Sequence, residues 1–303
     1  MPNIWTHIFF AEDVCNALSC ESHHSDYRYT LFLGAQGPDP FFYYRFWPWL
    51  SNNTGKDIGN ALHTKQCGPF LMHLIESAGK QSDETKVYVM GFITHHLLDR
   101  HTHPYIHYRA GYQGSKHQKL ETIIDTIWAF RTRKMELWKH PAYAEINVGN
   151  PLPASILYLL DDSIRKFYPA LSFQMQDIQT AYQDMITAQK LFADPDGWKN
   201  KILKPFISSY SHQPVNTSID YLNEAKKPWM HAATGEVRQE SFAELYEDAF
   251  HDAVSLLPLV ADYWKEGGTS VYEQLSRRIG NISYDTGTPL ANQDSNRFSV
   301  PIV

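Results

Sequence analysis

Histidine side chains are concentrated in the first part of this 303-residue chain, in a pattern suited to holding a metal ion. Eleven of the 15 histidines lie at or before His117, and five fall in the interval 95–107. His95 and Asp99 stand four residues apart in a segment with helical periodicity, so both side chains project from one helix face. His117 and Glu121 repeat this spacing in the next such segment. An imidazole and a carboxylate in this arrangement can bind one divalent ion, most typically zinc.

A histidine-rich segment, which we expect to form a loop, joins the two pairs. The sequence therefore predicts one metal cluster of His95, Asp99, His103, His117 and Glu121. The alternative is a core of histidines bonded to carboxylates without metal, which is costly because many ionisable groups are then buried uncompensated. Coordination of zinc turns that cost into binding energy. Asp125, one turn beyond Glu121, is either an acceptor for a ligand N–H group or a solvated acid.

Three positions upstream are further candidate ligands. His7 follows Ile-Trp-Thr, and His63 follows Asn-Ala-Leu. Asp39 lies in the segment GAQGPDP, whose glycines and prolines predict a rigid turn that presents a carboxylate inward.

Taken together, the ordered set of histidines and carboxylates resembles the zinc-dependent phospholipases C of bacteria, whose superfamily also includes fungal single-strand nucleases. The resemblance covers about the first 130 residues. It rests on the segments THIFFAEDV, LGAQGPDPFFYY, GFITHHLLDRHTHPYIHYRAG and HQKLETIID. It implies an all-α, multi-helix bundle of that family's type.

The resemblance also implies three metal positions and two to three zinc ions per chain, with iron or manganese as other possible ions. The first position would take Asp39, His63, His95 and Asp99. The second would take His103, His117 and Glu121. The third would take His7, share Asp99 as a bridge, and use the backbone at the N-terminus of the chain.

The chain departs from the family pattern at two ligand positions. His103 stands before Pro104 and close to Asp99, which leaves His101 and His107 open as substitutes for it. The chain begins Met-Pro, with Trp5 inside, whereas family members expose a terminal tryptophan. The third metal position is therefore less well defined than the other two.

The implied reaction is hydrolysis of a phosphoric ester, and the implied protein is a phospholipase C-like phosphodiesterase acting on a small phosphodiester or a phospholipid. Asp39 is the candidate base that orients the attacking water, besides being a ligand. Two alternatives stay open. One is a nuclease or nucleotide phosphoesterase with the same metals, and the other is a non-catalytic, metal-stabilised binding protein.

Aromatic residues follow Asp39 directly, in the segment FFYYRFWPW at 41–49. They are suited to contact a choline-like group, to stack on a base, to enter a lipid interface or to pack between helices.

The elements that position these residues are predicted to be helices at 82–100, 116–138, 154–167 and 175–194, with a fifth from the capping box Ser241/Glu244 to about 265, kinked at Pro258. Segments 34–40, 51–59, 141–153 and 211–217 predict breaks, and the tail from 281 is expected to be irregular.

We expect a metal-binding part at 1–145 and additional C-terminal helices at 150–303, packed on it or continuous with it. His212, His231 and His251 are isolated and suggest no site.

Composition is that of a globular protein, with 43% hydrophobic and 20% charged residues. The net charge of −6 argues against binding of duplex nucleic acid through its phosphates.

Three cysteines, Cys15, Cys20 and Cys67, cannot form a complete disulfide framework and predict free buried thiols. With no signal-like N-terminus and no transmembrane segment in view, we expect a cytoplasmic protein, with peripheral lipid contact possible. The oligomeric state has no signature in the sequence.

Overall fold

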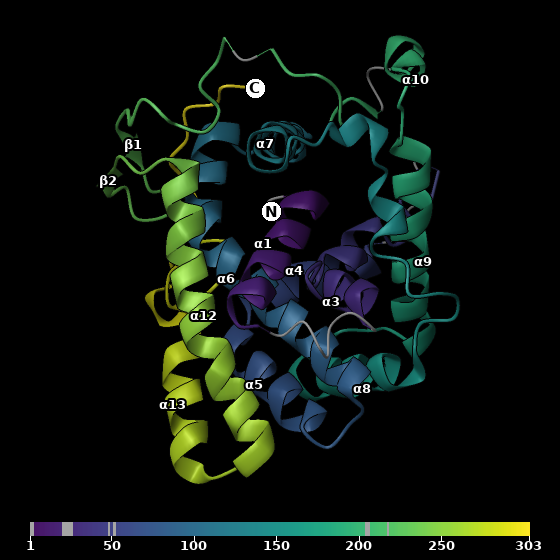
Figure 1. The fold of residues 1–303 in the computed structure, drawn as a ribbon, viewed down its shortest axis with the longest axis vertical. Coiled ribbons are helices and arrows are strands. Elements are labelled where there is room, and N and C mark those ends of the chain that lie inside the picture. Colours follow the sequence, from purple (N-terminus) through teal and green to yellow (C-terminus); the bar gives the residue numbers. More distant parts are fainter. Residues whose placement is uncertain (1–2, 20–26, 48, 51–52, 204–206, 217) are drawn as a thin grey trace.

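The computed structural model describes residues 3–19, 27–47, 49–50, 53–203, 207–216 and 218–303, and within these ranges the fold is built from helices (Figure 1). The prediction of an all-α fold is confirmed, since the strands described form only a short antiparallel hairpin. The helices are α1 (Ile4–Ala17), α3 (Arg28–Gly34), α4 (Thr54–Thr64), α5 (Cys67–Ala78), α6 (Asp83–Ala110), α7 (Lys116–Arg133), α8 (Ala154–Phe167), α9 (Met175–Phe192), α10 (Trp198–Ile202), α12 (Phe242–Glu266) and α13 (Thr269–Ile279). Short 3-10 helices are η1 (Asp39–Tyr43), η2 (Leu137–Lys139), η3 (Ala142–Ala144) and η4 (Leu290–Asn292), and the hairpin pairs β1 (Trp229–Met230) with β2 (Val237–Arg238).

Helix α6 lies at the centre of the molecule and packs against α1, α3, α5, α7 and α12 (Figure 1). The hydroxyl of Ser82 caps its first turn by accepting from the backbone N–H of Thr85, and Asp83 and Glu84 lie where the helix dipole favours acids. Its residues from Val87 to Arg100 are all buried, because neighbouring helices cover every face. The side chains of this stretch therefore point into protein on all sides, including toward the buried histidines and carboxylates of the candidate site.

Helix α6 continues well beyond residue 100, so the predicted histidine-rich loop is wrong. Pro104 lies inside the helix and cannot donate a hydrogen bond to the carbonyl of Arg100. A C-terminal loop approaches this carbonyl at Gly287, where an added Cβ atom would lie 2.3 Å from the Arg100 oxygen. Tertiary packing therefore holds the helix together across the proline. As a result His103 is helical and lies one turn after Asp99 on the same face.

The other predicted helices agree with the structure to different degrees. Segments 154–167 and 175–194 correspond to α8 and α9, and the Ser241/Glu244 capping box does begin α12. Helix α12 runs through Pro258 to Glu266. Helix α7 ends at Arg133 rather than 138, because Lys134 adopts a left-handed conformation with φ 55°.

Segment 51–59, predicted as a break, contains the start of α4. Its glycines conceal the helix in the sequence because glycine has low helix propensity. They let α4 lie close to η1: a Cβ atom at Gly55 would come within 2.4 Å of the carbonyl oxygen of Phe41. This close approach brings His63, near the end of α4, to Asp39 at the start of η1.

A single hydrophobic cluster of buried side chains, among the residues described, draws on both the 1–145 and the 150–303 segments. The division between a metal-binding part and an extension remains a prediction. Cys67 is a free, buried thiol as predicted, Cys15 is also buried, and Cys20 lies outside the described residues. No helix in the described ranges is both long enough and apolar enough to span a bilayer.

Candidate metal centre

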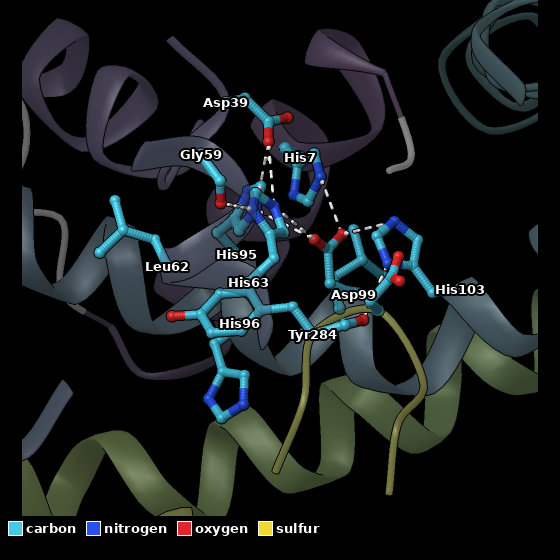
Figure 2. A network of polar contacts seen from close by, with 12 residues as sticks. His7, Asp39, Gly59, Leu62, His63, His95, His96, Asp99, His103 and Tyr284 are labelled. Atoms are coloured by element: carbon cyan, nitrogen blue, oxygen red, sulfur yellow. Dashed lines mark hydrogen bonds and ion pairs between the residues drawn. The ribbon is translucent and has the colours of Figure 1, made fainter. Parts of the chain in front are cut away.

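Asp99 lies at the centre of a buried cluster of histidines (Figure 2). Its Oδ2 atom is 3.0 Å from Nε2 of His95 and 3.9 Å from Nε2 of His63. Its Oδ1 atom is 3.3 Å from Nε2 of His7 and 3.7 Å from Nε2 of His103. Each carboxylate oxygen thus faces a different pair of imidazoles, which is the arrangement expected of a carboxylate that bridges two metal positions.

Backbone carbonyls fix the orientation of three histidine rings. Nδ1 of His95 bonds the carbonyl of Ala35 at 3.0 Å, and Nδ1 of His63 bonds that of Gly59 at 2.7 Å. Nδ1 of His103 bonds the carbonyl of Tyr284 at 2.8 Å. With Nδ1 protonated and donating, Nε2 carries the lone pair and points toward Asp99, as metal-bound histidines require.

Asp39 completes one side of the cluster from the tight turn that follows α3. Its Oδ1 atom lies 3.4 Å from Nε2 of His63 and 3.7 Å from Nε2 of His95. Gly37 in this turn has φ +51°, and a Cβ atom there would lie 2.4 Å from Cδ2 of His95. Only glycine combines that backbone conformation with such close contact to the ring. The turn therefore presents the carboxylate inward, as the sequence predicted.

His7 reaches the cluster from the first turns of α1, whose start is anchored by Asp125. The Asp125 carboxylate accepts from the backbone N–H groups of Trp5 at 3.1 Å and Thr6 at 2.9 Å. Its Oδ2 also lies 3.1 Å from Nε2 of His212. The His7 ring then stacks on His95 with a centroid separation of 4.2 Å. Asp125 is therefore a buried anchor for α1 rather than a solvated acid, and His212 is not isolated.

A second group of donors lies where α6 meets α7. Nε2 of His117 is 2.5 Å from Oε1 of Glu121, and the His103 ring lies 5.7 Å from that of His117. His107, one turn beyond His103, bonds Oδ1 of Asp285 at 2.6 Å. His101 points elsewhere, because its Nε2 lies 3.2 Å from Asp252 on α12. The geometry brings His107, but not His101, next to the predicted second position.

Within the described part of the chain, the donor atoms fall into four groups that could hold an ion. Three are His7/His95/Asp99, Asp39/His63/His95 and His103/His117/Glu121, which contain ligands predicted for the third, first and second positions, although His95 belongs to two of these groups and Asp99 to only one. The fourth, His103/His107/Asp285, was not predicted. The predicted ligand at the chain's N-terminus lies outside the described residues.

Many of these donor atoms are buried and have no hydrogen-bond partner in the described ranges. They are both oxygens of Asp99, Oδ1 of Asp39, and Nε2 of His7, His95 and His103. Their mutual distances of 3.0 to 3.9 Å lack hydrogen-bond geometry. Buried unpaired polar atoms are costly, and a divalent cation would satisfy them together. Imidazole nitrogen and carboxylate oxygen are the donors that zinc takes, so these residues fit zinc.

The electrostatics favour the protonation states that metal binding needs at His103, His117 and Asp99, whereas they favour the protonated form of His95. Burial lowers the pKa of His103 and of His117 well below the ordinary value, which keeps both imidazoles neutral. Burial also opposes protonation of His95, but the carboxylates of Asp99 and Asp39 outweigh it and raise the pKa of His95. For Asp99, burial favours the neutral acid, yet His103 and His95 hold its pKa well below the ordinary value. Asp99 is therefore a carboxylate anion.

The C-terminal tail contributes to the centre, which the sequence analysis missed. The backbone N–H of Tyr284 and the hydroxyl of Ser283 both donate to the carbonyl of His63, at 3.0 and 3.2 Å. The Tyr284 carbonyl orients His103, and Asp285 contacts His107. These contacts join residues far apart in the sequence, and no local motif in the tail marks them.

A cavity of about 1060 Å³ opens beside the centre. Its lining includes donors from both groups, among them Asp39, His63, His103 and Glu121. Much of the rest of the lining is apolar and comes from the aromatic segment after Asp39, from α9 and α10, and from residues that follow α10. Its apolar residues include Phe42, Tyr43, Phe46, Trp47, Trp49, Met185, Leu191, Phe192, Trp198, Leu203, Ile207 and Tyr210.

The helical fold and the buried cluster of histidines and carboxylates define an all-α protein with a candidate multinuclear metal centre. Residues 6–171 match the family described as zinc dependent phospholipase C. This match covers more than half of the chain, so the chain belongs to the zinc-dependent phospholipase C family, as its resemblance implied. The comparisons with curated proteins and with solved structures gave no match.

Proposed function

We propose that this protein is a zinc-dependent hydrolase of phosphodiesters, of the phospholipase C type. The observation that carries the proposal is the opening of the donor cluster onto the large cavity, since a purely structural zinc site would be closed. The proposed ligands are His7, Asp39, His63, His95, Asp99, His103, His117 and Glu121, holding two to three ions. Iron or manganese are the other ions that this donor set can bind.

Bound zinc would supply Lewis-acid stabilisation of phosphate oxygens and would lower the pKa of a water molecule. Among the protein groups, Asp39 is the candidate base. Its Oδ1 atom faces His63 and His95, while its side chain also lines the cavity. This position supports a role for Asp39 in orienting the attacking water and accepting its proton. The carbonyl-bonded rings of His63, His95 and His103 keep the donors fixed during the reaction.

The cavity wall favours a phospholipid over a polynucleotide as substrate. Aliphatic side chains such as Leu191, Leu203 and Ile207 lie among the aromatic ones, and only two lysines, Lys56 and Lys199, are found among the described residues that line it. A channel for single-stranded nucleic acid needs a basic groove that follows the phosphates. An amphiphile with its phosphate at the metal end and its apolar part along the wall matches this lining.

Metal analysis of protein prepared without added chelator, combined with a panel of phosphodiesters, tests this proposal. We expect two to three zinc ions per chain and hydrolysis of phosphatidylcholine and of soluble p-nitrophenyl phosphorylcholine. Single-stranded DNA should not be cleaved. Cleavage of DNA without cleavage of the lipid would favour the nuclease alternative. Bound zinc with no turnover of any ester would favour a metal-stabilised binding protein.

Replacement of Asp39 by Asn distinguishes the proposed role of this residue as the base from its proposed role as a metal ligand. The amide keeps a ligand oxygen but cannot accept a proton, so we expect zinc to be largely retained and kcat to fall by about 10²- to 10⁴-fold. Asp57→Asn on the exposed face of α4 is the control and should leave kcat unchanged. Full activity with full zinc content in the Asp39→Asn protein would refute the role of Asp39 as the base.

A further inference from the structure

Exposed apolar side chains gather at the mouth of the cavity. Trp49 is 73% exposed, Trp198 53% and Leu203 41%, and all three line the cavity. Ile202, beside Leu203, is 71% exposed. We call these four residues the apolar rim. Large apolar side chains clustered in water around the entrance of a binding cavity mark a surface that contacts another apolar phase.

Trp49 forms one side of the apolar rim, and Trp198, Ile202 and Leu203 form the other. Aromatic contacts along the cavity wall connect Trp49 to the end of α9, which precedes α10. Trp49 stacks on Trp47 with ring centroids 5.1 Å apart, and Trp47 stacks on Phe46 at 4.7 Å. Phe46 contacts Phe192 at the end of α9, at 6.1 Å. Helix α10, which carries the other side of the rim, follows α9 in the chain. The rim is therefore continuous with the apolar wall that leads to the metal centre.

Hydrogen bonds hold helix α10 in place although several of its side chains are exposed. Within Trp198–Ile202 no side chain is buried. The carboxylate of Asp194 accepts from the backbone N–H groups of Lys199 at 3.2 Å and Asn200 at 2.8 Å. The Lys199 ammonium donates to the carbonyls of Leu191 and Ala193. These hydrogen bonds fix the backbone that keeps Trp198 and Ile202 exposed. In Figure 1, α10 projects beyond the upper end of α9.

Charged and aromatic residues at the rim match the interface of a phospholipid bilayer. Lys56 at the cavity mouth and Lys201 on α10 are both exposed. Tryptophan is preferred at the level of lipid headgroups, and lysine there is attracted to lipid phosphates. A soluble protein partner would seal the cavity, whereas a bilayer would deliver an apolar substrate directly into it.

We propose that the apolar rim inserts into the surface of a phospholipid bilayer, so that the substrate lipid passes from the bilayer into the cavity without crossing water. This inference rests on the proposed function, because it takes the substrate to be a phospholipid. It adds the surface through which the protein meets that substrate.

Vesicle binding by the full chain tests this inference. Sedimentation with sucrose-loaded vesicles of equimolar phosphatidylcholine and phosphatidylglycerol, kept on ice, gives the partition coefficient. Ile202 does not line the cavity, so Ile202→Glu should leave hydrolysis of soluble p-nitrophenyl phosphorylcholine unchanged. It should lower vesicle partitioning by about tenfold or more, since a carboxylate replaces a side chain that would be buried in lipid. Ile202→Trp should increase partitioning.

Val237→Glu is the matched control, because Val237 is an aliphatic residue 66% exposed on β2, away from the cavity. It adds the same charge and should bind vesicles as the unchanged protein does. Equal partitioning of the Ile202→Glu and Val237→Glu proteins, or no binding by the unchanged protein, would overturn the inference. Loss of soluble-substrate hydrolysis in every protein, with the vesicle pattern as expected, would count against the proposed function alone.

Discussion

At the scale of single residues, Asp99 faces histidines from each of the three predicted metal positions. Its two oxygens face different histidines, and its contacts with these histidines lower its pKa although the side chain is fully buried. No other described carboxylate in the centre contacts as many imidazoles. A ligand shared in this way couples the occupancy of one position to that of its neighbour.

Asp99→Asn should therefore affect more than one ion. We expect zinc affinity to fall by more than about 100-fold, because loss of a group that merely supports a ligand already costs about 10- to 100-fold. Competition with a chelator, followed by metal analysis, measures this. Asp83→Asn is the control, since Asp83 lies on the same helix but is exposed at the surface. Loss of only a single ion, with the others bound at full affinity, would argue against a bridging role.

Local spacing was sufficient to predict several of these residues. His95 with Asp99, and His117 with Glu121, follow from the four-residue repeat of a helix face. His103 lies beside Asp99, but the sequence predicts it in a loop, whereas α6 continues through it and through Pro104. The contact that tolerates the proline, at Gly287, is made by residues nearly two hundred positions later and leaves no sign in the local sequence.

At the scale of elements, the turn after α3 determines how Asp39 meets His95. Gly37 has a positive φ and also lies against the His95 ring. Gly114 has a similar φ of +57°, but a Cβ atom there would meet nothing within 4 Å. A side chain at either position would strain the backbone, but only a side chain at Gly37 would also collide with the His95 ring. Comparing substitutions at the two glycines therefore distinguishes these two effects.

Gly114→Ala should destabilise the protein by about 1 kcal/mol, the cost of a left-handed conformation for alanine. Gly37→Ala should cost about 2 to 4 kcal/mol, since the added methyl group also displaces His95 or the turn. It should weaken zinc binding as well. Urea unfolding and chelator competition give both quantities. Equal effects of the two substitutions would show that the turn does not constrain His95.

Elements with strong end signals were predictable, and those stabilised mainly by tertiary contacts were not. Ser82 and the Ser241/Glu244 capping box located the starts of α6 and α12. Helix α4, with Gly55 and Gly59 inside it, reads as a break because its stability comes from packing on η1. The loop carrying Tyr284 has no periodicity, so its place beside His63 and His103 could not be inferred from sequence.

At the scale of the whole molecule, the buried histidines make the stability of the metal-free protein depend on pH. Burial lowers the pKa of His96, His103 and His117 well below the ordinary histidine value of about 6.5. The pKa of His95 is raised instead, but more of the buried histidines have a lowered pKa than a raised one. Below pH 6.5 the unfolded chain thus binds more protons than the folded one, so stability falls as the pH falls.

Between about pH 7.5 and pH 5.5, the free energy of unfolding of chelator-treated protein should fall by about 1.4 kcal/mol per pH unit for each net proton taken up on unfolding. His96→Gln should flatten this dependence, since it removes one buried imidazole. His251→Gln should not, because the His251 side chain is 69% exposed. Urea unfolding at a series of pH values measures the slope, and a slope of zero would contradict the assignment of neutral buried histidines.

The contact between His103 and the Tyr284 carbonyl has a consequence for biosynthesis. A ribosome exposes His7, Asp39, His63, His95 and Asp99 long before Tyr284, so the nascent chain carries most of the donors without the loop that orients His103 and clamps the end of α4. The centre can reach its final geometry only after the segment that carries Tyr284 has been translated. Tight metal loading would then distinguish chains that contain this segment from chains that stop before it.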